Sequence, residues 1–269
     1  MAAPDTNFTG SIPALYDECL GPLLFEPYAS DLAQRVASLS PQSVLETAAG
    51  TGIVTRELVK RLGPSARICS TDLNQAMLDI AAAKLSVPNL SWQQADATAL
   101  PFDDAIYDVV ACQFGVMFFP DKHIAFGEAR RVLAPGGRFL FNVWDRPELN
   151  PIADIINTAA IEMFPENPPL FIRRVPYGYN DADAIALTLE KAGFRDIVFH
   201  RLAKRSRGAS AREVAVGFCQ GTPLRNAAEA MGAGMLDALT AHATRLLENR
   251  YGTGPVEDGM QAIVFSAIR

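Results

Sequence analysis

The chain has 269 residues, of which 49% are hydrophobic and 20% are charged, and its formal net charge is −6. This composition is typical of a folded globular protein and offers no broad basic surface, so general electrostatic binding of nucleic acid is not expected. Four cysteines without a C-x-x-C pair and three isolated histidines argue against a disulfide framework and against a metal site.

The N-terminal part of the chain is expected to be helical. The first ten residues lack a basic segment followed by an apolar one, and no uncharged apolar run approaches the ~18 residues of a membrane span. The expected location is therefore the cytoplasm, without a membrane partner. Residues 14–36 are predicted to be helical, and residues 1–42 are expected to form a helical cover over the domain that follows.

From residue 43 onward, short β-rich runs alternate with amphipathic helical segments. Strands are predicted at 43–47, 66–72, 90–96, 107–114 and 138–144, and helices at 53–62, 75–85 and 121–133. This alternation with short connections predicts a parallel sheet with helices on both faces.

After residue 145 this alternation stops, and the chain becomes rich in proline and aromatic residues. A helix is predicted at 181–194 and strands at 195–202 and 261–268, and the last two are expected to form an antiparallel pair at a sheet edge. The short basic run from Arg201 to Arg207 is expected to be a solvated loop. The chain is predicted to be one domain, with a core at 43–145 and substrate-lid insertions at 146–180 and 205–258.

A glycine-rich turn follows the first predicted strand, in the stretch "SVLETAAGTGIVT". Gly50 and Gly52 lack a Cβ atom and let a ligand approach the backbone, and the N-terminus of the next helix favours an anion or an electron-rich group. The third glycine of a dinucleotide fingerprint would fall at Thr55. Its absence disfavours a nicotinamide oxidoreductase, and Thr55 itself is expected to matter little.

Aspartates stand at the ends of the next two predicted strands. Asp72 lies twenty residues beyond Gly52, the interval at which a carboxylate can accept hydrogen bonds from both ribose hydroxyls. Asp96 can accept a hydrogen bond from the exocyclic amine of adenine. Taken singly, the glycines suit a simple turn, Asp72 a helix cap and Asp96 a solvated loop. In this order and strand context they predict an adenosine site at the carboxyl edge of the sheet.

The stretch from residue 43 to residue 144 resembles the class I S-adenosylmethionine-dependent methyltransferases. "VLETAAGTG" looks like their first motif, "STDLNQAML" like the segment with the ribose acid, and "WQQADATALPF" like the adenine segment. "YDVVACQFGVMFFPD" and "EARRVLAPGGRFLF" resemble the regions of the fourth and fifth strands. The resemblance points to the small-molecule branch that includes the quinone-biosynthesis (UbiE/COQ5-like, methyltransferase type 11) enzymes.

This resemblance implies an α/β, Rossmann-like sheet of seven strands, mostly parallel, with the last strand antiparallel and inserted beside the fifth, and with helical lid insertions. It also implies S-adenosyl-L-methionine as cofactor and methyl transfer to a small aromatic or lipophilic metabolite. The residues that it implies at the cofactor are Glu46, Ala48, Gly50, Gly52, Asp72, Leu73, Met77, Asp96, Ala97, Gln113 and Phe114.

Within this set the resemblance implies particular roles. Glu46 would orient the glycine loop, Asp72 would hold the ribose, and Asp96 would meet the adenine with the backbone N–H of Ala97. Leu73 and Met77 would line the adenine, and Gln113 and Phe114 would lie near the sulfonium. Ala48 departs from the family motif, which has its first glycine at that position.

Residues outside these motifs are candidates for binding the acceptor and for removing a proton from it. Substrate contacts are expected among Tyr16, Met117, Phe118, Phe171 and Phe218, although core packing is the commoner role of each apolar side chain. Candidate general bases are Tyr16, His123, Tyr177 and Tyr179. Two alternatives stay open: a protein that binds the cofactor without transferring methyl, and, less favoured, an NAD-dependent oxidoreductase. A homodimer is also compatible with the sequence.

Overall fold

The computed structural model describes residues 4–269, and the first three residues of the expected N-terminal cover lie outside this range. The chain divides into two compact units, each assembled from separate stretches of sequence. Unit 1 takes in the chain up to Pro27, Asp145–Gly178 and Ala203–Gln261. Unit 2 consists of Tyr28–Trp144, Tyr179–Leu202 and Ala262–Arg269.

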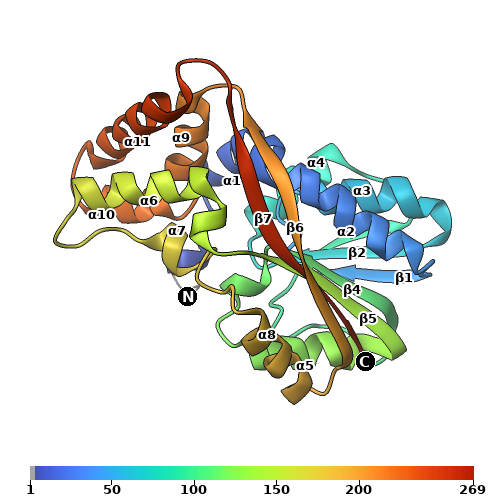
Figure 1. Ribbon diagram of the computed structural model, residues 1–269. Coiled ribbons are helices and arrows are strands. Elements are labelled where there is room, and N and C mark those ends of the chain that lie inside the picture. Colours follow the sequence, from blue (N-terminus) through green and yellow to red (C-terminus); the bar gives the residue numbers. More distant parts are fainter. Residues whose placement is uncertain (1–3) are drawn as a thin grey trace. The chain divides into compact units, whose positions relative to one another are not determined.

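Within the described residues, seven strands form one sheet in the order β3-β2-β1-β4-β5-β7-β6 (Figure 1). The strands are β1 (Ser43–Glu46), β2 (Arg67–Asp72), β3 (Leu90–Gln94), β4 (Tyr107–Gln113), β5 (Leu133–Trp144), β6 (Arg195–Gly208) and β7 (Val256–Ile268). β1 pairs in parallel with β2 and β4, β3 with β2, and β5 with β4, whereas β7 is antiparallel to β5. The predicted seven-stranded sheet, with the last strand inserted beside the fifth, is confirmed.

The helices of unit 2 cover both faces of the sheet, as predicted. They are α2 (Glu26–Ser38, which starts in unit 1), α3 (Ile53–Leu62), α4 (Gln75–Lys84), α5 (Lys122–Val132) and α8 (Ala182–Lys191). From β1 the chain passes through α3, β2 and α4 to β3 at one edge of the sheet. From β4, on the other side of β1, it passes through α5 to β5 in the opposite direction across the sheet. Because both sets of crossovers are right-handed, their helices lie on opposite faces: α3 and α4 on one, α5 on the other (Figure 1).

The middle strands are fully buried, which explains why their sequences are continuously apolar. Val44 and Leu45 of β1 and Val110 of β4 have no exposed surface, and Phe141 of β5 stacks on Phe265 of β7 with ring centroids 4.8 Å apart. Parallel strands covered on both faces need such runs, since neither face meets water.

Unit 1 contains the helices of the two predicted insertions and of the N-terminus. They are α1 (Ile12–Leu15), η2 (Tyr16–Phe25), α6 (Pro151–Met163), α7 (Phe171–Arg174), α9 (Ala211–Gln220), α10 (Leu224–Ala230) and α11 (Met235–Tyr251). α11 packs against α6 and α9, and α9 packs against η2. A Cβ atom at Gly217 would lie 2.8 Å from the Cβ of Cys19, so this glycine permits the close approach of α9 and η2. The insertions are therefore helical as expected, while their role as a lid stays a prediction.

Several strand boundaries differ from the prediction. β3 ends at Gln94, so Asp96 follows the strand by two residues, and β5 begins at Leu133, before the glycine pair. The basic run is not a loop, because β6 continues through it to Gly208. There Arg205 and Arg207 both donate to Glu257 of β7, over 2.6 Å and 3.3 Å. The short basic run suggested a solvated loop, but on a strand these arginines pair with an acidic residue of the neighbouring strand.

Among residues 4–269, no helix combines the length and the apolar character that spanning a lipid bilayer requires.

Candidate functional site

The candidate site lies in unit 2, at the carboxyl ends of β1, β2, β3 and β4. The strand order reverses between β1 and β4, and open α/β sheets bind ligands at such a switch point. The parallel registers bring the ends of β1, β2 and β4 to one edge, so that Glu46 lies beside Ser70 and Ala111. The polar residues predicted at the strand ends are thereby gathered at one edge of the sheet.

The glycine loop after β1 has an unusual backbone, held by its neighbours. Ala48, Gly50 and Gly52 have φ angles of +53°, +56° and +78°, a region that L side chains rarely adopt. The N–H of Thr47 donates to the carbonyl of Ala111 over 2.9 Å, on the β4 side. The N–H of Ala49 donates to the Thr71 carbonyl of β2 over 2.8 Å.

The two glycines of the loop are required for different reasons. A Cβ atom at Gly52 would lie 2.9 Å from Cη2 of Trp92 and 3.0 Å from Cβ of Ala81, so this glycine allows the loop to pack against β3 and α4. A Cβ at Gly50 would meet only Cε of Met77, at 3.6 Å. The open side of the loop, where a ligand could approach the backbone, is therefore at Gly50.

Ala48 adopts the backbone conformation that a glycine would take at this position of the family motif. Its methyl group is accommodated because residue 115 is a glycine: a Cβ there would lie 2.4 Å from Cβ of Ala48 and 2.7 Å from Sγ of Cys112. The alanine therefore keeps the loop conformation that the motif needs, at a cost in backbone strain of about 1–2 kcal/mol.

Replacing Ala48 with glycine should therefore stabilise unit 2 without altering ligand binding. We expect A48G to raise the free energy of unfolding by about 0.5–1 kcal/mol, because the relief of strain is partly offset by the greater freedom of glycine in the unfolded chain. Urea titration checks this, with A105G as the matched control, since Ala105 has a similar φ of +61° away from the glycine loop. A loss of stability in A48G alone would show that the methyl group is needed for packing.

Asp72 connects the end of β2 to the glycine loop. Its Oδ2 accepts the N–H of Gly50 over 2.9 Å, and its Oδ1 accepts the N–H of Asn74 over 2.8 Å at the start of α4. The side chain is buried, which raises its pKa, and the two backbone N–H groups oppose that shift. A carboxylate has about four acceptor positions, so Asp72 can hold the loop and still accept hydrogen bonds from a ligand.

Glu46 is buried beneath the loop and joins three elements. Its Oε2 accepts the hydroxyl of Thr55 on α3 over 2.5 Å and the hydroxyl of Ser70 on β2 over 2.8 Å. Burial raises its pKa from 4.5 to about 7, against the lowering effect of these two hydroxyls. The expectation that Thr55 matters little is wrong: the residue in place of a third glycine holds the buried glutamate.

Asp96 and Ala97 lie in a tight turn beyond β3. The Oδ1 of Asp96 accepts the N–H and the hydroxyl of Thr98, over 2.8 Å and 2.7 Å, and its carbonyl accepts the N–H of Ala99 over 3.0 Å. Asp96 is exposed, so one face of the turn is open to a ligand. Leu73 is 39% exposed at the end of β2, whereas Met77 is buried against the loop.

The end of β4 carries an aromatic cluster. Phe114 has a φ of +50°, and its N–H donates to Oδ1 of Asn142 over 3.0 Å. Its ring stacks on Trp144 with centroids 3.8 Å apart and meets the edge of Tyr28 at 5.3 Å. A bulky residue in this conformation is strained, and such strain is commonest at functional sites. Gln113 directly precedes it, at the last position of β4.

The expected substrate residues fall in both units. Met117 and Phe118 lie in η4 (Val116–Phe118), just beyond β4 in unit 2. Tyr16, Phe171 and Phe218 belong to unit 1, where Phe171 and Phe218 are buried and Tyr16 stacks on Phe25 with centroids 4.8 Å apart. Their part in binding an acceptor stays a prediction.

The four candidate bases have different surroundings. His123 is exposed on the first turn of α5, and Tyr177 is buried in unit 1. Tyr179 lies near Lys122, whose Nζ is 5.1 Å from the ring centroid, and burial raises the pKa of this phenol to about 12. Tyr179 is therefore protonated at neutral pH, which makes it a poor acceptor of protons.

Sequence reasoning missed several residues that build the site. Thr55 and Ser70 hold Glu46, and Asn142, Trp144 and Tyr28 hold Phe114. The sequence did contain a sign of the two hydroxyls: Ser70 lies in an apolar strand and Thr55 on a buried helix face, and buried hydroxyls need a polar partner. Asn142, inside the apolar fifth strand, gave the same signal. Among the described residues, no cluster of histidine, cysteine and acidic side chains suited to a metal ion occurs.

The sequence is similar to known methyltransferases. The model of the ubiE/COQ5 methyltransferase family matches residues 26–211. Ubiquinone/menaquinone biosynthesis C-methyltransferase UbiE of Pasteurella multocida is 37% identical over 127 residues, which cover 46% of this chain and less than half (47%) of that protein. The same enzyme of Klebsiella pneumoniae is 29% identical over 174 residues, covering 60% and 69% of the two chains.

Two crystal structures share the fold across most of the chain. The YcgJ protein of Bacillus subtilis has a TM-score of 0.57 at 18% identity, covering 89% of this chain and 98% of its own. Phosphoethanolamine N-methyltransferase 2 of Haemonchus contortus, solved in complex with S-adenosyl-L-methionine, has a TM-score of 0.53 at 17% identity, covering 97% and 60%. The family model matches well over half of the sequence, including the loop after β1 and the ends of β2 to β4. The chain therefore belongs to the ubiE/COQ5 methyltransferase family.

Proposed function

We propose that the protein transfers a methyl group from S-adenosyl-L-methionine to a small lipophilic acceptor of the quinone type. The observation that carries this proposal is the arrangement at the switch point: a glycine loop with positive φ, a buried aspartate bonded to it, and an open aspartate turn on the next strand. Membership of the ubiE/COQ5 methyltransferase family supports the cofactor, and the names of the UbiE relatives support the acceptor class.

In this proposal the cofactor lies across three strand ends. The methionine part would lie on the open side of the glycine loop at Gly50, and the ribose hydroxyls would donate to Asp72. The adenine amine would donate to Asp96, with Ala97 offering its backbone N–H to a ring nitrogen. The acidic groups at Asp72 and Asp96 suit these hydrogen-bond donors, because a carboxylate accepts and never donates when ionised.

The cofactor supplies an activated methyl group on a sulfonium, so the protein has to align the acceptor and exclude water. We propose that the ring of Phe114, fixed by Trp144 and Tyr28, forms an apolar wall beside the reacting centre. Gln113 would mark the junction between cofactor and acceptor. In transfer to a ring carbon of an ionised phenol, the carbon–methyl bond would form as the sulfonium–methyl bond breaks. The ring proton would then pass to water or to one of the candidate bases.

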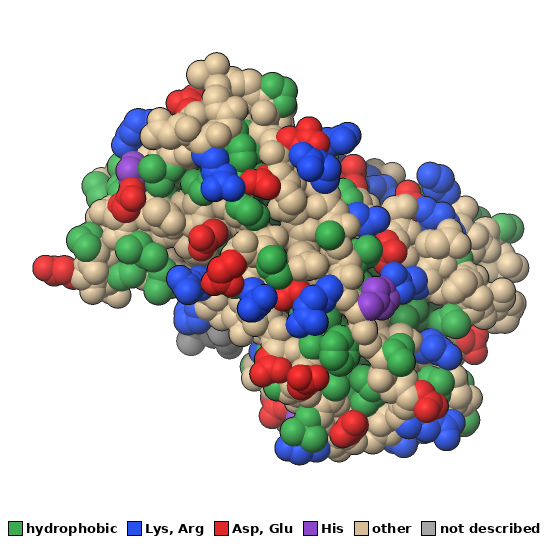
Figure 2. All heavy atoms as spheres, viewed as in Figure 1, with side chains coloured by type: hydrophobic (Ala, Val, Ile, Leu, Met, Phe, Trp, Pro, Cys, Tyr) green, Lys and Arg blue, Asp and Glu red, His purple; other side chains and the backbone are tan. Residues whose placement is uncertain are grey.

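The surface suits a small-molecule acceptor better than nucleic acid. On the face shown in Figure 2, acidic and basic side chains are interspersed, and the net charge of the chain is −6. Phosphate binding calls for a continuous basic surface. We keep two further expectations within this proposal: action in the cytoplasm, and a homodimer that light scattering in solution would reveal.

Calorimetry and a labelling assay test the proposal in two steps. The purified protein is expected to bind S-adenosylmethionine and S-adenosylhomocysteine with micromolar dissociation constants. Incubation with cofactor labelled in the methyl group and a panel of quinols should then place label in a small molecule. Absence of micromolar binding would contradict the cofactor assignment. Binding without any labelled product, also with a metabolite extract, would favour a cofactor-binding protein that does not methylate.

A further inference from the structure

The connection between β3 and β4 has no helix, although it carries the proposed adenine turn. Residues 95–106 form only turns and one isolated bridge, between Asp96 and Ala99. Parallel strands are usually joined through a helix whose packing fixes the crossover. Without one, this connection is held by individual hydrogen bonds to the rest of unit 2, some from side chains and others from the backbone, such as that from the N–H of Ile106 to the carbonyl of Val132 over 2.9 Å.

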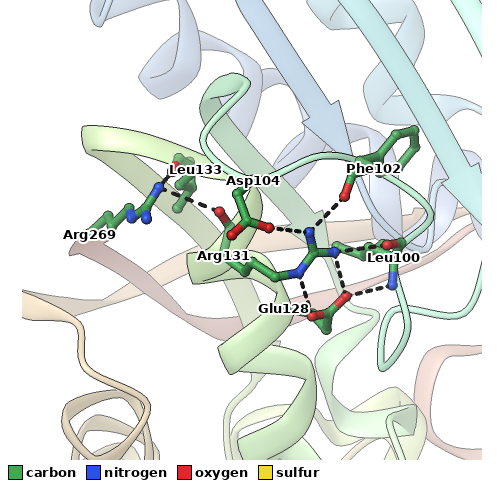
Figure 3. Close-up of polar contacts among 7 residues, drawn as sticks. All are labelled: Leu100, Phe102, Asp104, Glu128, Arg131, Leu133 and Arg269. Atoms are coloured by element: carbon green, nitrogen blue, oxygen red, sulfur yellow. Dashed lines mark hydrogen bonds and ion pairs between the residues drawn. The ribbon is translucent and has the colours of Figure 1, made fainter.

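Arg131 of α5 uses every donor that it has: three of its hydrogen bonds reach this connection, and two reach Glu128 of the same helix (Figure 3). Its Nη1 donates to the carbonyl of Phe102 over 2.7 Å and to Asp104 over 2.8 Å. Its Nη2 donates to the carbonyl of Leu100 over 2.9 Å and to Glu128 over 2.8 Å, and its Nε donates to Glu128 over 2.7 Å. An arginine has five N–H groups, and all five are used here.

Glu128 and the backbone of Arg131 complete the attachment. The Oε2 of Glu128 also accepts the N–H of Leu100 over 2.8 Å, so the backbone N–H and the backbone carbonyl of Leu100 are both held. The carbonyl of Arg131 accepts the N–H of Ala105 over 2.9 Å. The guanidinium of Arg131 holds the pKa of Glu128 below its usual range, so the carboxylate stays charged at neutral pH.

The attachment begins directly after the turn that carries the proposed adenine contact. Asp96, Ala97, Thr98 and Ala99 are bonded to one another, and Leu100 is the next residue. The position of this turn is therefore set on one side by β3 and on the other by the bonds from α5 to Leu100. On the β3 side the N–H of Ala95 donates to the carbonyl of Asp72 over 3.0 Å, so the bonds to Leu100 fix the other end of the same short turn.

We propose that Arg131 and Glu128 form a positioning pair for adenine recognition, which they control without touching the cofactor. This inference rests on the proposed function, because it assigns the purpose of the pair to the binding of S-adenosylmethionine. The pair fixes the loop so that Asp96 is in place before the cofactor arrives. Removing it leaves the glycine loop and Asp72 unchanged and loosens only the adenine end of the site.

Binding of two probes by calorimetry tests the pair. The probes are S-adenosylhomocysteine and its analogue with hydrogen in place of the adenine amine. The native protein should prefer S-adenosylhomocysteine about tenfold, the worth of one hydrogen bond to a charged group. In R131Q we expect about tenfold weaker binding of S-adenosylhomocysteine and a preference reduced to about threefold or less. E128Q should also weaken the binding of S-adenosylhomocysteine and reduce the preference for it over the analogue.

The matched control is R130Q, on the same helix. Arg130 also donates to a backbone carbonyl, that of Gly193 over 2.9 Å, but does not contact the β3–β4 connection. R130Q should keep the native affinity and preference, even where its melting temperature falls as far as that of R131Q. If R131Q does not fold, R131K provides the same comparison, because lysine keeps the positive charge without the forked geometry of arginine. R131K should bind S-adenosylhomocysteine more weakly than R130Q does.

The outcomes separate this inference from the proposed function. If the native protein binds neither probe, the cofactor assignment is wrong and the inference falls with it. If the native protein binds and discriminates, but R131Q and R131K retain both the affinity and the preference, the pair is merely structural and the inference alone is overturned. Reduced preference in R131Q with native preference in R130Q supports it.

Discussion

Replacing Asp72 with asparagine is expected to weaken the binding of S-adenosylhomocysteine by about 100-fold. Asparagine keeps only one, neutral acceptor oxygen, so one hydrogen bond from a ribose hydroxyl is lost and the other is weakened. Together these changes cost about 3 kcal/mol, and 1.4 kcal/mol corresponds to tenfold in affinity. The amide would also turn an NH₂ group toward one of the two backbone N–H groups, of Gly50 or Asn74, that the carboxylate accepts. The loop and the ribose are thus both affected by one substitution.

A ribose-modified ligand separates these two effects. The analogue of S-adenosylhomocysteine that lacks both ribose hydroxyls should bind the native protein about 100-fold more weakly than the parent compound. In D72N the difference between the parent and the analogue should fall to about tenfold or less, because one neutral amide oxygen is the acceptor that remains for the hydroxyls. The control is D79N, which changes an exposed aspartate on α4 that accepts from Gln75 over 2.8 Å. If the analogue binds more weakly than the parent compound by the same factor in the native protein and in D72N, Asp72 acts on the loop alone.

The sheet and the position of the site could be predicted because they depend on local patterns. Buried parallel strands are continuously apolar, and a glycine turn followed by Asp72 has a fixed spacing. Strand ends were harder to predict, because β6 and β7 continue into unit 1, where charged residues such as Arg205, Arg207 and Glu257 stand among buried ones. The sequence of β6 there gives no apolar alternation, and its pairing through Glu257 depends on a residue about fifty positions away.

The supports of the site were harder to predict than its candidate ligands. Gly52 was assigned to the ligand, but its absent Cβ makes room for Trp92 and Ala81. Arg131 belongs to a segment that the sequence marked only as a helix end, although it bonds to residues about thirty positions earlier. Such contacts depend on how α5 packs beside the β3–β4 connection, and periodicity within one segment carries no information about them.

Glu46 should make the stability of unit 2 fall as pH rises. Its pKa is raised from 4.5 to about 7 in the folded protein, so between these values the folded state binds a proton that the unfolded state releases. The free energy of unfolding decreases with pH wherever the folded state binds more protons. One pKa unit corresponds to 1.36 kcal/mol, so the native protein should lose about 3 kcal/mol between pH 4.5 and 7 through this group.

The variant E46Q isolates this effect, because glutamine keeps an acceptor for Thr55 and Ser70 and does not titrate. We expect its stability relative to the native protein to increase by about 3 kcal/mol from pH 4.5 to 7.5. Urea unfolding followed by tryptophan fluorescence measures it, since the only tryptophans of the chain, Trp92 and Trp144, both lie in unit 2. If the stability of E46Q relative to the native protein decreases as pH rises, the hydroxyls of Thr55 and Ser70 lower the pKa of Glu46 by more than burial raises it. In that case Glu46 would stabilise the fold as a carboxylate. If the advantage of E46Q instead grows with rising pH, as expected, Glu46 lowers the stability of the protein at neutral pH while it joins β1, β2 and α3 beneath the loop.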